Sequence, residues 1–163
     1  MASARIILGA ALAAACIGGT ALAQPQREVI ATREAPEAIG PYSQAIRVGN
    51  TLYLAGQIAF DPTTNRLIED GSIEAQTRRV LDNLRAVLRA AGMDMEHVVS
   101  TTVFMSDLNE FGRMNEVYAT YFRSNPPARA TIQAARLPRD VKVEIAAVAV
   151  SLKSRLRTRS AGC

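Results

Sequence analysis

The spacing of hydrophobic and polar positions changes several times along the chain, and each change predicts an element. Short apolar runs rich in β-branched residues predict strands at 28–32, 45–48 and 51–55. Gly49 and Asn50 separate the last two runs, and this dipeptide between apolar runs is typical of a hairpin. The first part of the fold is therefore expected to be a sheet that contains a β-hairpin.

Two later stretches carry apolar residues at helical spacing. Ser72 is a typical N-cap and Gly92 a typical C-terminal stop, so a helix is predicted from Ser72 to about residue 91. A second helix is predicted over 108–124, where large apolar residues recur every three or four positions. The first helix has one apolar face, as expected of a helix that covers a sheet. That face comprises Ile73, Val80, Leu84, Val87, Leu88 and Ala91.

Three further strands complete the pattern. They are predicted at 97–105, 130–134 and 141–152, and turn-rich segments lie at 61–65 and 136–140. The order is three strands, a helix, a strand, a helix and two strands. This order predicts an α+β fold, a mixed β-sheet with two helices packed on one face.

The N-terminal residues 1–23 have the pattern of a secretory signal peptide. Arg5 precedes a run of small and apolar residues that ends in Ala21-Leu22-Ala23, a typical A-x-A cleavage site. The run is short and diluted for a membrane-spanning helix, which needs about 20 strongly apolar residues. We therefore expect cleavage after Ala23 and a periplasmic location.

A lipoprotein signal is the alternative for the same segment. The stretch from Leu12 to Cys16 is close to such a signal, although its leucine lies one position too far from the cysteine. Acylation of Cys16 would anchor the protein to the membrane; otherwise no membrane partner is expected.

Residues 24–163 predict a single domain, with a core at about 28–152 and a basic tail at 153–163. The signal peptide holds one basic residue and no acid, so its removal leaves 18 basic and 15 acidic residues. The excess lies in the tail, at Lys153, Arg155, Arg157 and Arg159. Aromatic residues make up only 5% of the chain, so a basic groove with stacking rings is not expected. We expect no nucleic-acid partner.

Few residues suited to metal or nucleophile chemistry are present. His97 is the only histidine, which disfavours a histidine-based zinc site or a Ser-His-Asp triad, and we interpret it as structural or surface-exposed. Cys163 is the only cysteine after the signal peptide, so no internal disulfide is expected. The chain has no phosphate-binding glycine loop, GxSxG or CxxC motif. We therefore expect no metal and no cofactor.

Six short motifs cluster near the ends of the predicted elements. They are AIGPYSQ at 38–44, AGQI at 55–58, TTVF at 101–104, NEVY at 115–118, PPAR at 126–129 and RLPRDVKVE at 136–144. In this order they resemble the RidA (YjgF) family, from about Ile30 to Val150. Each fragment alone is a weak signal, but their combination is highly specific.

The resemblance implies a chorismate-mutase-like fold in which three copies associate as a trimeric barrel with active sites between neighbouring subunits. It implies an enamine/imine deaminase, which hydrolyses 2-aminoacrylate or 2-iminopropanoate to a 2-keto acid and ammonia without a cofactor. The expected partner is a small carboxylate-bearing imine or a ligand resembling a keto acid. Such a site must hold a carboxylate, place a water molecule and transfer protons.

The resemblance assigns the catalytic roles to Arg129 and Glu144. Arg129 matches the arginine that binds substrate, and a guanidinium can grip a carboxylate with two parallel hydrogen bonds. Glu144 matches the glutamate that orients or activates the attacking water. Its apolar neighbours predict a raised pKa, unless it is an outward-facing carboxylate paired with Lys142 or Arg139.

The remaining substrate-binding positions implied by the resemblance are Tyr42, Gly56 and Asn115, and two more depart from the family pattern. Deaminase-active members commonly have a serine where this chain has Ala55, which offers no side-chain hydrogen bond. They commonly have a cysteine where this chain has Thr131, which keeps a hydroxyl of similar size.

Two other functions are consistent with these motifs. Ala55 and export favour a non-catalytic trimer of the same fold that binds a small metabolite or a protein. A ribonuclease or translation-inhibitor activity is attributed to some relatives, but export and the lack of a basic, aromatic-lined groove count against it.

Overall fold

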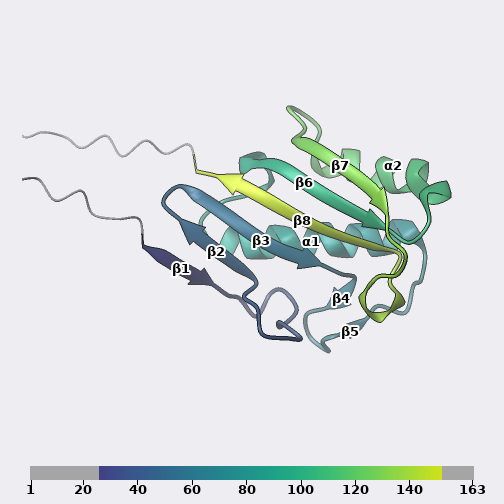
Figure 1. Ribbon diagram of the computed structural model, residues 1–163, viewed down its shortest axis with the longest axis horizontal. Coiled ribbons are helices and arrows are strands. Elements are labelled where there is room, and N and C mark those ends of the chain that lie inside the picture. The colour runs from purple at the N-terminus through teal and green to yellow at the C-terminus, as the bar shows by residue number, and fades with distance from the viewer. Residues whose placement is uncertain (1–25, 152–163) are drawn as a thin grey trace, which may run out of the picture.

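The computed structural model describes residues 26–151 (Figure 1). The predicted signal peptide with Cys16, the basic tail and Cys163 lie outside the described residues. The six-stranded mixed sheet has the order β1-β2-β3-β8-β6-β7. Its strands are β1 (Arg27–Ile30), β2 (Ala45–Val48), β3 (Thr51–Gln57), β6 (Val98–Met105), β7 (Ala128–Gln133) and β8 (Val143–Val150). The predicted α+β class is confirmed.

The two helices α1 (Ile73–Ala90) and α2 (Phe111–Tyr121) lie together behind the sheet (Figure 1). Ser72 caps α1 as predicted, because its hydroxyl accepts a hydrogen bond from the Ala75 N–H at 3.2 Å. Gly92 follows the helix with φ +69°, a conformation that favours glycine. Both predicted ends of the first helix are therefore confirmed.

The hydrophobic core lies between this pair of helices and one face of the sheet. In β8 buried and partly exposed residues alternate, so Val143, Ile145, Ala147 and Ala149 face the helices. The predicted apolar face of α1 is buried except for Ala91, which is partly buried at the C-cap, and Leu81 adds to that face. Burial of large apolar side chains along this layer is the main source of the fold's stability.

The predicted boundaries of the second helix were wrong. Residues Leu108–Glu110 form a separate 3-10 turn (η2), in which the Asp107 carboxylate accepts a hydrogen bond from the Asn109 N–H. Helix α2 then begins at Phe111 and ends at Tyr121, before Asn125, whose φ is +52°. Two prolines follow directly and prevent a longer helix.

The last strands also differ from the prediction in detail. Strand β7 begins at Ala128, so Arg129 lies inside the strand rather than before it. The turn-rich segment at 61–65 joins a small hairpin of β4 (Phe60–Asp61) and β5 (Arg66–Leu67). His97 lies in a 3-10 turn (η1, Met95–His97), where its Nδ1 accepts a hydrogen bond from the Asp94 N–H; the structural interpretation is confirmed.

Within residues 26–151, no helix has the length and apolar character that crossing a membrane requires. The same part of the chain contains no cluster of three or more histidine, cysteine or acidic side chains that could hold a metal ion.

Candidate active site

Glu144 lies on the sheet face that the helices leave uncovered. It pairs in register with Phe104 of β6, and its neighbours Val143 and Ile145 point to the opposite, buried face. Burial raises the pKa of the Glu144 carboxyl, the direction expected from its apolar neighbours. The carboxyl group therefore exchanges protons nearer to neutral pH than an exposed glutamate does.

No ion pair among the described residues involves Glu144. The alternative of a salt bridge to Lys142 is wrong, because the Lys142 ammonium binds Glu110 at 2.8 Å. Arg139 makes no such pair either, and its backbone adopts a left-handed conformation with φ +58°. The Glu144 carboxylate is thus free to bind a ligand or a water molecule.

Gly56 provides the space that the Glu144 side chain occupies. A Cβ at position 56 would lie 2.9 Å from Glu144 Cδ and closer still to Oε1. Strand β3 has an irregularity here, because the register with β8 shifts between Leu54 and Gln57. The glycine and the bulge together bring the β3 backbone next to the carboxylate, and Ala55 precedes this point.

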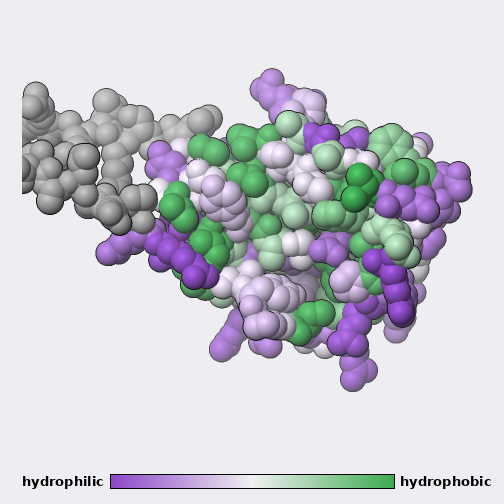
Figure 2. All heavy atoms as spheres, in the orientation of Figure 1, coloured by the Kyte–Doolittle hydropathy of each residue, from purple (hydrophilic) through white to green (hydrophobic). Residues whose placement is uncertain are grey.

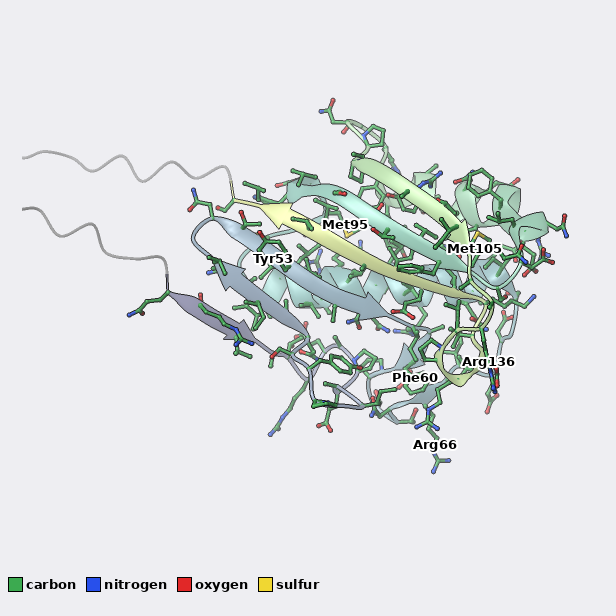
Figure 3. The ribbon with its side chains drawn as sticks, in the orientation of Figure 1. Tyr53, Phe60, Arg66, Met95, Met105 and Arg136 are labelled. Atoms are coloured by element: carbon green, nitrogen blue, oxygen red, sulfur yellow. The ribbon has the colours of Figure 1, made fainter. Side chains whose placement is uncertain are left out.

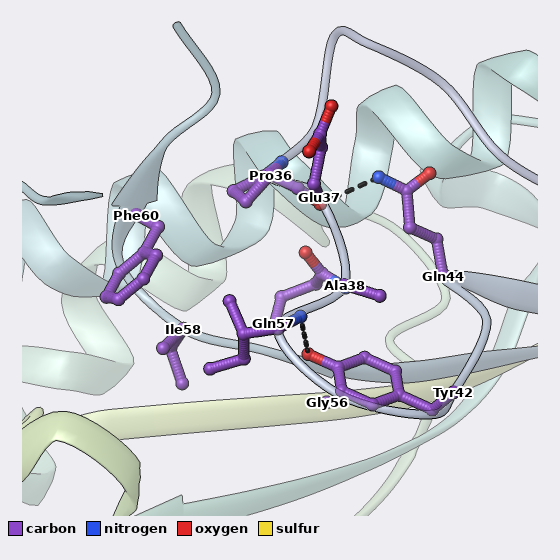
Figure 4. A pocket seen from close by; sticks show the side chains of 10 residues that line it. Pro36, Glu37, Ala38, Tyr42, Gln44, Gly56, Gln57, Ile58 and Phe60 are labelled. Atoms are coloured by element: carbon purple, nitrogen blue, oxygen red, sulfur yellow. Dashed lines mark hydrogen bonds between the residues drawn. The ribbon is translucent and has the colours of Figure 1, made fainter. Parts of the chain in front are cut away.

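Tyr42 lies on the loop that connects β1 to β2, close to Gly56 (Figure 4). The residue is 49% exposed, and its hydroxyl accepts a hydrogen bond from the Ile39 N–H at 3.2 Å. A small, partly open cavity bordered by Tyr42 and Gly56 measures about 20 Å³, which holds roughly one water molecule. Tyr42 and Ala55 also line a larger, open hollow of about 670 Å³ on the same side.

Gln44 organises the loop that carries Tyr42. Its buried amide accepts a hydrogen bond from the Thr32 N–H at 2.7 Å and donates to the carbonyls of Thr32, Ala35 and Pro36. Figure 4 includes the bond to Pro36. Gln44 belongs to one of the six motifs, but its role was not predicted, because its partners lie 8 to 12 positions away in the chain.

Arg129 lies on the other face of the sheet, at the edge strand β7. It pairs in register with Thr101 of β6, which is 2% exposed and faces the helices. The guanidinium carbon lies 4.6 Å from the ring centre of Tyr118 and 5.5 Å from that of Phe111. No ion pair among residues 26–151 includes Arg129.

Asn115 and Thr131 lie on α2 and β7, the helix that contacts Arg129 and the strand that carries it. Asn115 falls on α2 between Phe111 and Tyr118, at helical spacing from both. Thr131 follows Arg129 by two positions on β7, so both side chains point to the same side. The Thr131 hydroxyl is buried and has no hydrogen-bond partner among the described residues, so it can accept or donate a bond to a ligand.

The predicted site residues therefore form two groups on opposite faces of the sheet. We call Tyr42, Ala55, Gly56 and Glu144 the Glu144 half-site, and Asn115, Arg129 and Thr131 the Arg129 half-site. The strand pairing shows this separation. Phe104 pairs with both Glu144 and Ile132, so these three side chains point to the uncovered face. Arg129 and Thr131 alternate with Ile132 along β7, so their side chains point to the helix face. One chain does not bring the two half-sites together.

The uncovered sheet face is largely apolar. A row of paired residues crosses four strands on this face: Val29, Ile46, Tyr53 and Val148. Val29 is 58% exposed and Tyr53 52% exposed. Figure 2 shows hydrophobic residues gathered on this side of the molecule, and Figure 3 labels Tyr53 there on β3. Such a face usually marks an interaction surface.

Known proteins resemble this chain over the whole described domain. The family model described as endoribonuclease L-PSP matches residues 32–151. A 2-iminobutanoate/2-iminopropanoate deaminase of Mus musculus is 50% identical over 124 residues, which are 76% of this chain and 91% of the relative.

Two solved structures extend the comparison. RidA from the Antarctic bacterium Psychrobacter sp. has a TM-score of 0.73 and 41% identity, covering 76% of this chain and 99% of that chain. TdcF of E. coli, solved with bound serine, has a TM-score of 0.72 and 41% identity, covering 76% and 98% respectively. The chain therefore belongs to the RidA (YjgF/L-PSP) family.

Proposed function

We propose that the protein is an enamine/imine deaminase whose active site forms when the Arg129 half-site of one copy meets the Glu144 half-site of another. The observation that carries this proposal is that a fixed guanidinium and a fixed carboxyl group lie on opposite faces of one sheet, each without an opposite charge among the described residues. Unpaired, positioned charges of this kind are typical of binding and catalytic groups.

The chemistry assigns a separate task to each group. The Arg129 guanidinium holds the carboxylate next to the C=N bond of the substrate through two parallel hydrogen bonds. Ionised Glu144 takes a proton from water as the water oxygen adds to the imine carbon, and it delivers that proton to the nitrogen. A second proton moves from the new hydroxyl to the nitrogen; the C–N bond breaks, and ammonia and a 2-keto acid result.

The remaining residues of the half-sites support this assignment. The Thr131 hydroxyl and Asn115 flank Arg129, where they can bind the substrate carboxylate or the departing nitrogen. Tyr42 borders the cavity beside Gly56, which has room for roughly one water molecule. The deaminase name of the mouse relative and the serine bound to TdcF, a small carboxylate-bearing ligand, support the same substrate class.

We infer a homotrimer in which the apolar sheet face is buried. The exposed row that includes Val29 and Tyr53 supports burial of this face, and the opposite placement of the half-sites requires a second copy for every complete site. Light scattering of the purified protein tests the assembly. A monomer at micromolar concentration that still hydrolyses imines would contradict it.

We also propose that the mature protein is periplasmic, since Arg5 and the apolar run that ends at Ala23 have the pattern of a cleaved signal. The intact mass of the native protein distinguishes cleavage after Ala23 from acylation at Cys16.

The decisive experiment is hydrolysis of 2-iminopropanoate and 2-iminobutanoate, generated in situ by an amino-acid oxidase. We expect acceleration by the mature protein, a loss of about 100-fold in kcat/KM for Arg129→Ala, and no loss for Arg123→Ala, an exposed arginine outside both half-sites. A folded oligomer without any acceleration would favour the non-catalytic binding trimer, which Ala55 already makes the second candidate.

A further inference from the structure

Tyr118 is a buried tyrosine whose surroundings link it to Arg129. Its side chain is 5% exposed, and its hydroxyl lies 2.8 Å from the hydroxyl of Thr101, which is 2% exposed. Thr101 is the register partner of Arg129 on the neighbouring strand. Burial raises the pKa of Tyr118, although the hydrogen bond to Thr101 and the charge and hydrogen-bonding of the nearby Arg129 act in the opposite direction. The ring is therefore a neutral, anchored surface beneath the guanidinium.

The contact with Arg129 is made through the ring and not through a carboxylate. The guanidinium carbon lies 4.6 Å from the ring centre of Tyr118, a distance at which a cation is attracted to the aromatic face. Two other arginines are held differently: Arg113 binds both carboxylate oxygens of Glu74, and Arg136 binds both oxygens of Asp140. Each of these guanidinium groups already holds a carboxylate through two parallel N–H bonds.

An aromatic ring restrains an arginine without occupying it with a competing carboxylate. An arginine at a sheet edge otherwise samples many rotamers, and ordering it on binding weakens the complex. A carboxylate partner would restrain it too, but would compete with the carboxylate of the substrate. The aromatic contact restrains Arg129 and leaves most of its five N–H groups available to a carboxylate.

We propose that Tyr118, anchored by Thr101, is a positioning residue that orients the Arg129 guanidinium for the substrate carboxylate. This inference rests on the proposed function for its substrate, but the contact itself would serve any small 2-oxo or 2-imino acid. Phe111, 36% exposed and 5.5 Å from the guanidinium, makes the weaker contact, because nothing comparable to Thr101 anchors it among the described residues.

The test compares four variants in steady-state kinetics. Tyr118→Leu removes the ring, and we expect KM to rise about tenfold while kcat stays within about twofold. Tyr118→Phe and Thr101→Val each remove only the hydroxyl bond, and each should raise KM about twofold to threefold. Because both remove the same bond, the double variant should match the single ones.

Tyr121→Leu is the matched control. Tyr121 also lies on α2, its hydroxyl binds Asp82 at 2.9 Å, and its ring lies 5.1 Å from the guanidinium of another arginine, Arg85. Its loss removes the same kinds of contact at a place away from both half-sites. We expect KM to stay unchanged in this variant.

Binding of 2-oxobutanoate, measured by calorimetry, separates this inference from the proposed function. A dissociation constant that rises in Tyr118→Leu but not in Tyr121→Leu supports the positioning role even if no variant hydrolyses imines. Equal effects of the two leucine variants, a fall in kcat at constant KM, or no binding of 2-oxobutanoate to the unchanged protein would each overturn it. Should Tyr118→Leu not fold, the pair Tyr118→Phe and Thr101→Val carries the same test.

Discussion

The Glu144 side chain fills the space in which a side chain at Gly56 would begin. A Cβ at that position would lie 2.9 Å from Glu144 Cδ, within the distance at which atoms must shift. Gly56→Ala therefore displaces the carboxyl group, and we expect kcat to fall by about 100-fold, because misplacement by about 1 Å has effects of that size. Steady-state hydrolysis of 2-iminobutanoate measures the change.

Gly71→Ala is the control for the glycine substitution. No atom lies within 4 Å of a Cβ added at Gly71, so this variant should keep full activity. If Gly56→Ala also kept it, the position of Glu144 would not matter for the reaction.

The sequence predicted most elements of the fold, because each has a local signal. The cap at Ser72, the hairpin at Gly49 and the alternation of β8 depend on residues close together in the chain. The small hairpin of β4 and β5 was not predicted, since each strand has only two residues and is too short to show an alternation of apolar and polar residues.

The interior of the site was less predictable, since its contacts are non-local. Thr101 and Tyr118 share a hydrogen bond across 17 positions of sequence, and only the parallel pairing of β6 with β7 brings Arg129 beside them. The motifs identified Arg129 and Glu144 individually. Only the pairing of the strands in the structure shows that these two side chains point to opposite faces of the sheet.

Ala55→Ser tests the departure from the family pattern next to Gly56. A serine adds a hydroxyl that can hydrogen-bond the substrate or the attacking water, and one such bond contributes roughly 0.5 to 1.5 kcal/mol. We expect kcat/KM for 2-iminopropanoate to rise by about twofold to tenfold. An unchanged or lower value would mean that the alanine is suited to a different substrate of this protein.

The raised pKa of Glu144 predicts that the ionised form needed for activity makes the folded protein less stable. Its folded-state pKa lies above the ordinary value of 4.5, so its favourable contribution to folding is present below that pH and is lost as the pH rises through the raised pKa. Above the raised pKa the folded protein holds an ionised carboxylate in a partly buried place.

Glu144→Gln removes that charge, so it should raise the melting temperature at pH 7 to 8 and leave it nearly unchanged near pH 4. It should also lower kcat by about 100-fold or more, since the general base is lost. Thermal unfolding across this pH range is the measurement, with Glu34→Gln at an exposed position as the control. A variant less stable than the unchanged protein at pH 8 would contradict the prediction.

The separation of the half-sites predicts complementation between two inactive variants. Arg129→Ala destroys the Arg129 half-site and keeps the other, and Glu144→Gln does the reverse. If every site joins one half-site from each of two neighbouring copies, a mixed oligomer contains some sites with both an intact arginine and an intact glutamate.

Random mixing of equal amounts should restore about one quarter of the sites, because each of the two intact halves is present with a probability of about one half. The two variants are unfolded and refolded together, and the activity is compared with that of variants refolded separately and then combined. Mixing the double variant, Arg129→Ala with Glu144→Gln, with either single variant should restore nothing, since one intact half-site is then missing everywhere. If no co-refolded mixture is active, Arg129 and Glu144 either act from the same copy or do not act in the same site. The proposal of an interfacial site would then have to be abandoned.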